Sequence, residues 1–115
     1  MLHFLVENAT SGSAVTIVLR AQPDDSEAGY RFMIDFGTKV ISLGDRHRSY
    51  SRMCDFDARR PVEVLVFLQG SVVECFVSEG YCFTMRAYDY SQGTARLGPL
   101  AKGIRVNHFS ARVCE

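Results

Sequence analysis

Three apolar segments joined by short glycine-containing turns place the strongest constraint on the fold of this chain. They cover Val62–Leu68, Ser71–Val77 and Tyr81–Tyr88, with Gln69-Gly70 and Ser78-Glu79-Gly80 between them. Valine and aromatic residues concentrate in these segments, which favours strands over helices. Because the turns are so short, successive strands must pair antiparallel. Residues 62–88 are therefore predicted to form a three-stranded meander.

The same pattern of short apolar segments and turns extends over the rest of the chain. No stretch of about twelve residues keeps the 3.6-residue period of an amphipathic helix, whereas strand-like segments recur roughly every ten residues. This spacing predicts an all-β fold, either a sandwich or a barrel. The polar interval Gly44–Arg60 is expected to be a loop with one edge strand. Further strands are predicted at residues 1–6, 14–20, 30–36, 39–43, 94–98 and 103–113, with a hairpin turn at Gly37 and Thr38.

Length and charge limit the kinds of partner that this chain is expected to have. Its 115 residues and 47% hydrophobic content fit one globular domain, expected to span residues 1–115, with no metal or other cofactor needed to supply a core. The 13 basic and 13 acidic side chains balance, so no nucleic-acid, anionic-membrane or other polyanion partner is expected. The opening apolar run ends at Glu7, too short for a signal peptide or a membrane span. No compartment is indicated.

Four cysteines and three histidines raise the question of a metal site or a catalytic group. The closest pair, Cys75 and Cys82, is too widely spaced for a zinc-binding pair, and the histidines are scattered, so no metal site is expected. Both cysteines lie in apolar runs, which favours reduced thiols in the core. The even cysteine count leaves disulfides open. No histidine accompanies a serine or cysteine in a nucleophile motif.

Two groups of charged residues are candidates for a binding site. Asp45, Arg46 and their neighbours form a cluster that could hold an anion through an arginine fork, or could simply be a charged turn. Glu74 lies within an apolar strand and must face solvent or find a cation, for which Arg86 on the next strand is the candidate. A cross-strand ion pair is the favoured interpretation, and a carboxylate tuned for catalysis is the alternative.

Aromatic side chains offer another kind of site, because sugar rings stack on flat aromatic faces. Most of the phenylalanines fall in strand-like segments and are expected in the core. Tyr50, Tyr88 and Tyr90 lie near predicted strand ends and loops, where they could form a shallow carbohydrate-binding patch.

The meander carries a resemblance to a known family. Residues 64–88 contain Val66-Phe67-Leu68-Gln69-Gly70-Ser71, then Val73-Glu74-Cys75-Phe76, Gly80, and finally Thr84-Met85-Arg86 with Tyr88. This succession resembles the C-terminal β-sandwich domain of glycoside hydrolase family 32, which contains invertases, inulinases and levanases. Upstream, residues 30–46 are similar to a hairpin of that family ending in an Asp-Arg pair. Two residues depart from the family pattern. Gln69 stands where the family often has Asp, and Cys75 stands where it usually has Val or Leu.

The resemblance implies a fold and a role. The fold would be a two-sheet antiparallel β-sandwich of the concanavalin or jelly-roll type, which in the family packs beside a catalytic five-bladed propeller. The propeller motifs W-M-N-D-P-N-G and R-D-P are absent from this sequence, and the dipeptide Glu74-Cys75 falls inside the sandwich signature. The implied role is a noncatalytic module that stabilises or partners a catalytic propeller or a second subunit. The alternative is a stand-alone lectin-like or protein-interaction sandwich, with Asp45, Arg46, Glu74, Arg86 and Tyr88 as candidate binding or structural residues.

Overall fold

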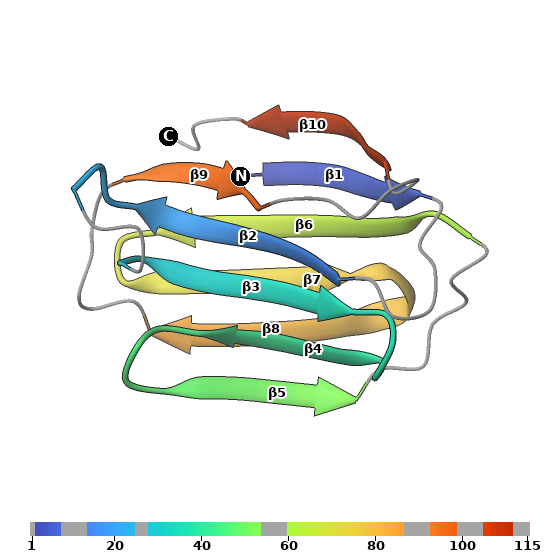
Figure 1. Ribbon diagram of the computed structural model, residues 1–115, viewed down its shortest axis with the longest axis horizontal. Coiled ribbons are helices and arrows are strands. Elements are labelled where there is room, and N and C mark those ends of the chain that lie inside the picture. Colours follow the sequence, from blue (N-terminus) through green and yellow to red (C-terminus); the bar gives the residue numbers. More distant parts are fainter. Residues whose placement is uncertain are drawn as a thin grey trace.

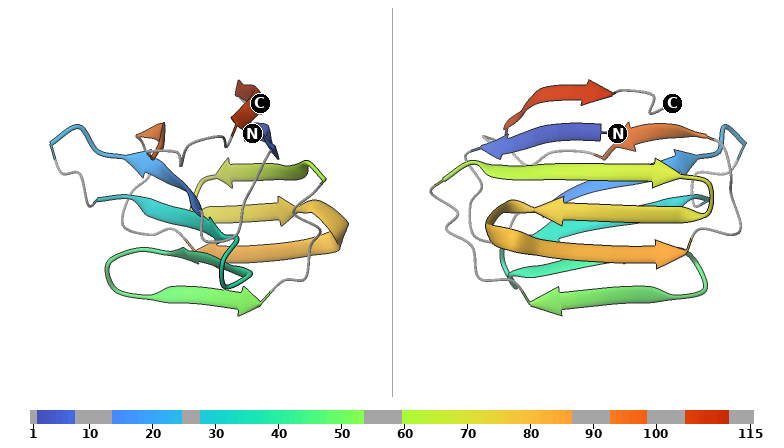
Figure 2. Two further views of the ribbon diagram at one scale, coloured as in Figure 1. Left: turned by 45° about the vertical axis from the view of Figure 1, so that its right-hand side comes forward. Right: turned by 180° about the vertical axis from the view of Figure 1, so that it is seen from behind.

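Ten strands form two antiparallel sheets in the computed structural model, which describes residues 2–7, 14–24, 28–53, 60–86, 93–98 and 105–111. Sheet A contains, in spatial order, β10 (Arg105–Ala111), β1 (Leu2–Glu7), β6 (Val62–Gln69), β7 (Val72–Val77) and β8 (Tyr81–Arg86). Sheet B contains β5 (Ser49–Met53), β4 (Val40–Gly44), β3 (Tyr30–Asp35), β2 (Ala14–Ala21) and β9 (Thr94–Leu97). Sheet B lies in front in Figure 1, and sheet A lies in front in the right panel of Figure 2, which views the molecule from behind.

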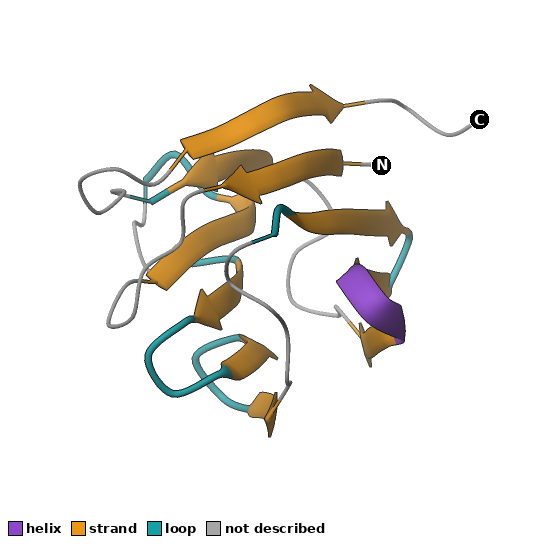
Figure 3. Cartoon of the chain, turned by 90° about the vertical axis from the view of Figure 1, so that its right-hand side faces the viewer, coloured by secondary structure: helices purple, strands orange, loops and turns teal. Residues whose placement is uncertain are grey.

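This arrangement confirms the predicted two-sheet sandwich and excludes the barrel. The predicted meander is β6, β7 and β8, and the edge strand expected in the polar interval is β5. The turn expected between β7 and β8 is a single 3-10 turn, η1 (Ser78–Gly80), drawn in purple in Figure 3. The predicted continuation of β8 to Tyr88 lies outside the described residues. Within the described residues, no helix is long and apolar enough to cross a bilayer.

Alternation of apolar side chains builds the core between the sheets. In β6, Val62, Val64 and Val66 point inward and are buried, whereas Glu63 faces solvent. The same period of two recurs in β1 and β3. Each sheet therefore contributes one apolar face to a shared core. Its largest fully buried side chains are Phe4, Val6, Val15, Ile17, Leu19, Tyr30, Phe32, Ile34, Ile41, Leu43, Val62 and Val64.

A β-bulge interrupts the pairing of β2 with β9. The register shifts between Val18 and Ala21, and Arg20 adopts a left-handed φ of 52°. Glycine is required on both sides of this bulge. A Cβ at Gly29 would lie 2.8 Å from the Leu19 carbonyl oxygen, and one at Gly93 would lie 2.5 Å from the carbonyl carbon of Arg20. The bulge and these glycines together fix how β3 and β9 begin.

Two contacts join the sheets at the edge formed by β5 and β8. The guanidinium carbon of Arg52 lies 5.6 Å from the ring centroid of Tyr81, within the range of a cation–π interaction. Arg48, in the turn before β5, donates a hydrogen bond of 2.6 Å from Nη2 to the carbonyl oxygen of Arg86. The edge of sheet B is thereby held against the end of β8.

The described cysteines differ in environment. Cys75 and Cys82 are both free thiols, and Cys75 is buried as expected. Cys82 is exposed, so its predicted place in the core is wrong. The reason is strand alternation: Phe83 points inward, which turns Cys82 to the outer face of sheet A, opposite Phe76. Cys54 and Cys114 lie outside the described residues.

Replacing Phe32 with alanine tests the core. Phe32 is 1% exposed, so the F32A variant should lose about 3–5 kcal/mol of unfolding free energy, from lost burial and an unfilled cavity. The matched control is F76A, because Phe76 is 36% exposed on the outer face of sheet A. Urea unfolding monitored by circular dichroism measures both. Equal losses in the two variants would contradict the assigned core.

Cys75 should make stability depend on pH in the alkaline range. Burial, and secondarily the neighbouring Cys82, raises the pKa of the Cys75 thiol from 9.0 to about 12. The unfolded chain releases this proton at lower pH than the folded chain, so this contribution to stability is complete below pH 9 and is lost as pH rises towards 12. The urea midpoint should therefore decrease less between about pH 8 and about pH 10.5 in C75V than in the wild type. The C82S control should keep most of the wild-type loss of stability between these pH values, because burial is the larger cause of the raised pKa. A loss in C75V equal to that of the wild type would contradict the assignment.

Candidate functional site

Asp45 organises the turn between β4 and β5. Its backbone N–H donates to the Arg48 carbonyl oxygen at 2.8 Å. Its carboxylate Oδ1 accepts hydrogen bonds from the backbone N–H groups of His47 at 2.8 Å and Arg48 at 3.0 Å. An aspartate before a tight turn commonly satisfies turn amides in this way. The charged cluster predicted from the sequence is thus a structured turn in which Asp45 has a clear local role.

A pocket of about 340 Å³ opens beside this turn, on the outer face of sheet B. It lies where β3 begins, β4 ends and β5 begins, at the left of these strands in Figure 1. The volume is near the lower end of the range, about 300–1,000 Å³, that is usual for small-molecule sites. The residues lining the pocket are Gly29, Arg31, Ser42, Gly44, Asp45, Arg46 and Ser49.

Two glycines leave room for this hollow. A Cβ at Gly44 would lie 2.5 Å from the Arg48 carbonyl oxygen and 2.7 Å from the Cα of Ser49, so a side chain there would push the turn away. Gly29 has a φ of 114°, a conformation that L side chains rarely adopt, and its missing Cβ also accommodates the bulge in β2. The backbone therefore forms part of the pocket lining, and both glycines are needed for its shape.

The polar groups of the pocket suit a ligand rich in hydroxyl groups. Ser42 and Ser49 supply hydroxyls that both donate and accept, while the guanidinium groups of Arg31 and Arg46 donate only. Among the described lining residues, Asp45 supplies the one carboxylate. Hydrolysis of a glycosidic bond by the usual mechanism needs two carboxylates across the bound sugar. The described lining is therefore equipped to bind but lacks that catalytic pair.

The structure divides the predicted site residues between two faces. Asp45 and Arg46 both line the pocket on sheet B. Glu74 and Arg86 are on the outer face of sheet A, where Glu74 lines a separate pocket of about 390 Å³ with Phe67, Gln69 and Val72. Tyr88 lies outside the described residues.

The expected ion pair between Glu74 and Arg86 is not formed. Thr84 is the register partner of Glu74, and Val72 is the partner of Arg86, so the two charged residues are only diagonal neighbours. The Arg86 guanidinium instead donates from Nη1 to Ser71 Oγ at 3.5 Å. The backbone carbonyl oxygen of Arg86 accepts the hydrogen bond from Arg48, which links Arg86 to the turn beside the pocket.

Tyr50 is the one described member of the tyrosine patch predicted from the sequence, and it does not line the pocket. Tyr50 is 50% exposed, but it is the register partner of Leu43, an inward-facing residue. Ser49 and Ser51 therefore point to the opposite face of β5 from Tyr50. Tyr90, like Tyr88, lies outside the described residues.

Arg31, Ser42 and Ser49 were not predicted as site residues. Arg31 and Ser49 are the register partners of Gly44, and Ser42 lies at an outward position two residues before Gly44 on β4. Strand alternation alone would have marked Arg31 and Ser42 as outward. The convergence of β3, β4 and β5 at one end required the pairing of the strands to be known.

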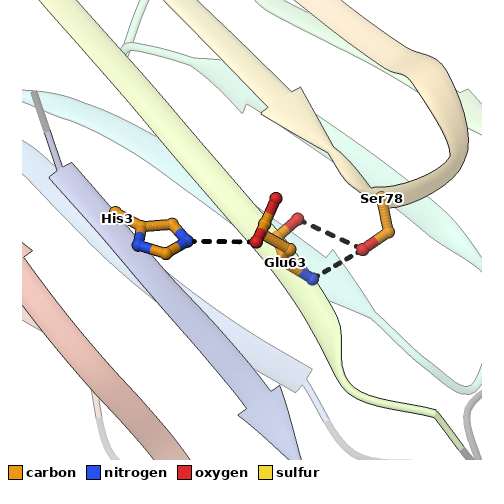
Figure 4. Close-up of polar contacts among 3 residues, drawn as sticks. All are labelled: His3, Glu63 and Ser78. Atoms are coloured by element: carbon orange, nitrogen blue, oxygen red, sulfur yellow. Dashed lines mark hydrogen bonds and ion pairs between the residues drawn. The ribbon is translucent and has the colours of Figure 1, made fainter.

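A second polar cluster lies on the outer face of sheet A (Figure 4). His3 Nε2 is 3.2 Å from Glu63 Oε2, joining β1 to β6. Ser78 Oγ accepts a hydrogen bond of 2.6 Å from the Glu63 N–H and donates one of 3.4 Å to the Glu63 carbonyl oxygen. Because the hydroxyl is bonded to backbone while the imidazole faces the carboxylate, this geometry holds strands together rather than activating a nucleophile. Among the described residues, no group of three or more His, Cys, Asp or Glu could hold a metal ion.

Comparison with solved structures identifies proteins of similar fold. Galectin LEC-6 of Caenorhabditis elegans superimposes with a TM-score of 0.71 and 18% sequence identity, over 96% of this chain and 81% of that one. Carbohydrate-binding module CBM66 from Bacillus subtilis gives a TM-score of 0.71 at 9% identity, over 94% of this chain and 72% of that one. No protein-family model and no curated protein sequence matches the chain. At these identities the likeness establishes the β-sandwich fold.

Asp45 can be tested for its role in the turn. Removing its carboxylate in D45A leaves two backbone N–H groups without their partner, which should lower the unfolding free energy by about 1–2 kcal/mol. D45N keeps a side-chain oxygen at the same place and should lose less than half as much. Urea unfolding measures both, with D24A, in an exposed turn, as the control. A D45A variant as stable as D24A would contradict the role of Asp45.

Proposed function

We propose that this chain is a noncatalytic carbohydrate-binding β-sandwich whose ligand occupies the pocket between β3, β4 and β5. The observation that carries the proposal is the lining of that pocket, where serine hydroxyls, two guanidinium groups and one carboxylate converge on a volume of about 340 Å³. Sugar hydroxyls act both as donors and as acceptors, and these side chains offer both kinds of partner.

The structural neighbours support the same proposal. One is a galectin and the other is named as a carbohydrate-binding module, and both share this fold. The single carboxylate in the described lining supports binding without hydrolysis. Fold likeness alone does not assign a function, so the proposal depends on the pocket residues.

A calorimetric titration tests the proposal. The folded chain should release heat with members of a panel that includes sucrose, inulin and levan fragments and galactosides. S42V removes a pocket hydroxyl while placing a strand-favouring residue at that position, and should weaken binding at least several-fold. The matched control is T84V, which removes a hydroxyl from the outer face of sheet A and should bind as the wild type does.

Three results would contradict the proposal. They are the absence of heat for every sugar with a well-folded sample, an equal effect of S42V and T84V, and hydrolysis of any of these sugars by the purified chain.

A second candidate function is attachment to another protein surface. The outer face of sheet A presents Leu5, Leu65, Phe67 and Phe76, and the rings of the two phenylalanines meet edge to face at 5.7 Å. Apolar side chains gathered on an outer sheet face favour a protein contact. In line with the family 32 resemblance, the proposed partner is a catalytic propeller of that kind. Co-sedimentation with an isolated family 32 propeller should detect the complex, and F76S should weaken it. No association with the wild-type chain would overturn this candidate.

A further inference from the structure

We infer that the pocket prefers an acidic saccharide, whose carboxylate or sulfate is held by Arg31. This inference rests on the proposed function, because it names the class of sugar that the same pocket takes. It starts from the charges of the described lining, where Arg31 and Arg46 stand against the carboxylate of Asp45, and it assigns the anion to Arg31 alone.

Arg31 lies at the centre of the row of residues that crosses sheet B beside the pocket. Its register partners are Gly44 on β4 and Val18 on β2, and beyond them the row continues to Ser49 on β5 and Arg96 on β9. The row therefore holds two arginines and no acidic residue. The two arginines are two strands apart, about 10 Å. An anionic group in the pocket would meet positive charge along this row.

The aspartates that flank Arg31 on this face are already bonded elsewhere. Asp45 Oδ1 accepts from two backbone N–H groups of the β4–β5 turn. At the other end of β3, Asp35 Oδ1 accepts from the N–H groups of Gly37 at 2.9 Å and Thr38 at 3.2 Å. Asp35 is four residues from Arg31, roughly 13 Å along an extended strand. Within the described residues, no carboxylate pairs with the Arg31 guanidinium.

The chemistry of arginine sets the ligand class. A guanidinium presents parallel N–H donors that match the two oxygens of a carboxylate or sulfate, and such charge-assisted bonds are stronger than those to a neutral hydroxyl. Ser42 and Ser49 beside it can bind the hydroxyls of the same sugar ring. The arrangement therefore combines one anion site with hydroxyl sites inside one pocket. Free phosphate or an acidic peptide would use only the anion site.

The test compares matched pairs of oligosaccharides by calorimetry. Trigalacturonate and a hyaluronan tetrasaccharide are each titrated beside their carboxyl-reduced forms, which keep the linkages and lose the charge. The acidic member of at least one pair should bind about tenfold or more tightly than its reduced form. A glutamate oligopeptide of similar charge serves as the non-sugar anion and should not bind.

Variants assign the effect to Arg31. R31Q should remove the acidic preference and leave weak binding of the reduced sugar, whereas R31K, which keeps the charge but lacks the fork, should retain part of it. The control is R60Q, which removes an exposed arginine outside the pocket lining and should behave as the wild type does.

The outcomes separate this inference from the proposed function. If the reduced sugars bind as tightly as the acidic ones, the acidic preference is overturned and carbohydrate binding stands. Equal binding of the glutamate peptide, or an equal effect of R31Q and R60Q, also overturns the inference. If no acidic sugar binds, the inference is overturned, and the neutral panel described above decides the proposed function by itself.

Discussion

The burial of alternate residues between two sheets is the constraint on which the rest of this structure depends. Val62, Val64 and Val66 on β6 face the inward side chains of sheet B, and a shift of register by one residue would expose them and bury Glu63 instead. Because side chains alternate along each strand, the inward positions also determine which residues face outward. The pocket residues Arg31 and Ser42 are outward because Phe32 and Leu43 are inward.

The pocket depends on the core through the backbone as well as through alternation. The bulge at Arg20 displaces β2 beside the start of β3, where a side chain at Gly29 would strike the Leu19 carbonyl oxygen. Gly44 likewise leaves room at the end of β4, where a side chain would strike the carbonyl oxygen of Arg48 in the turn. Asp45 then fixes that turn by binding its amides, and Arg48 ties it to β8 on the other sheet. The binding surface is in this way a consequence of how two strand ends meet.

Strands were predictable from the sequence because each carries its own local signal. The meander of β6, β7 and β8 follows from apolar segments and turn residues, and the structure confirms it. The structure also confirms the edge strand expected in the polar interval, which is β5. Relations between strands were less predictable. The expected Glu74–Arg86 pair fails because Thr84 lies opposite Glu74, and Arg86 is two residues further along β8. Cys82 was expected in the core because its segment is apolar, but only one of the two faces of that segment is buried.

Because the pairing of strands was not predictable, only part of the pocket lining was predicted. Asp45 and Arg46 were found because they are adjacent in the sequence, whereas Arg31 and Ser49 reach the pocket from separate strands. Asp45 also proved to have a structural task that a charged cluster in sequence does not reveal.

Net charge misleads in a related way, because it sums over both faces of the sandwich. The chain has no net charge, which argues against binding driven by a long-range field. The charges are nevertheless grouped locally, since Arg31 and Arg96 share a row on sheet B that contains no acidic residue, whereas Glu7, Glu63 and Glu74 point outward from sheet A. At physiological ionic strength the screening length is about 8 Å. A ligand in the pocket is therefore influenced by the guanidinium groups beside it and little by the glutamates on the other sheet. A neutral protein can in this manner recognise one anionic group on a sugar without attracting polyanions in general.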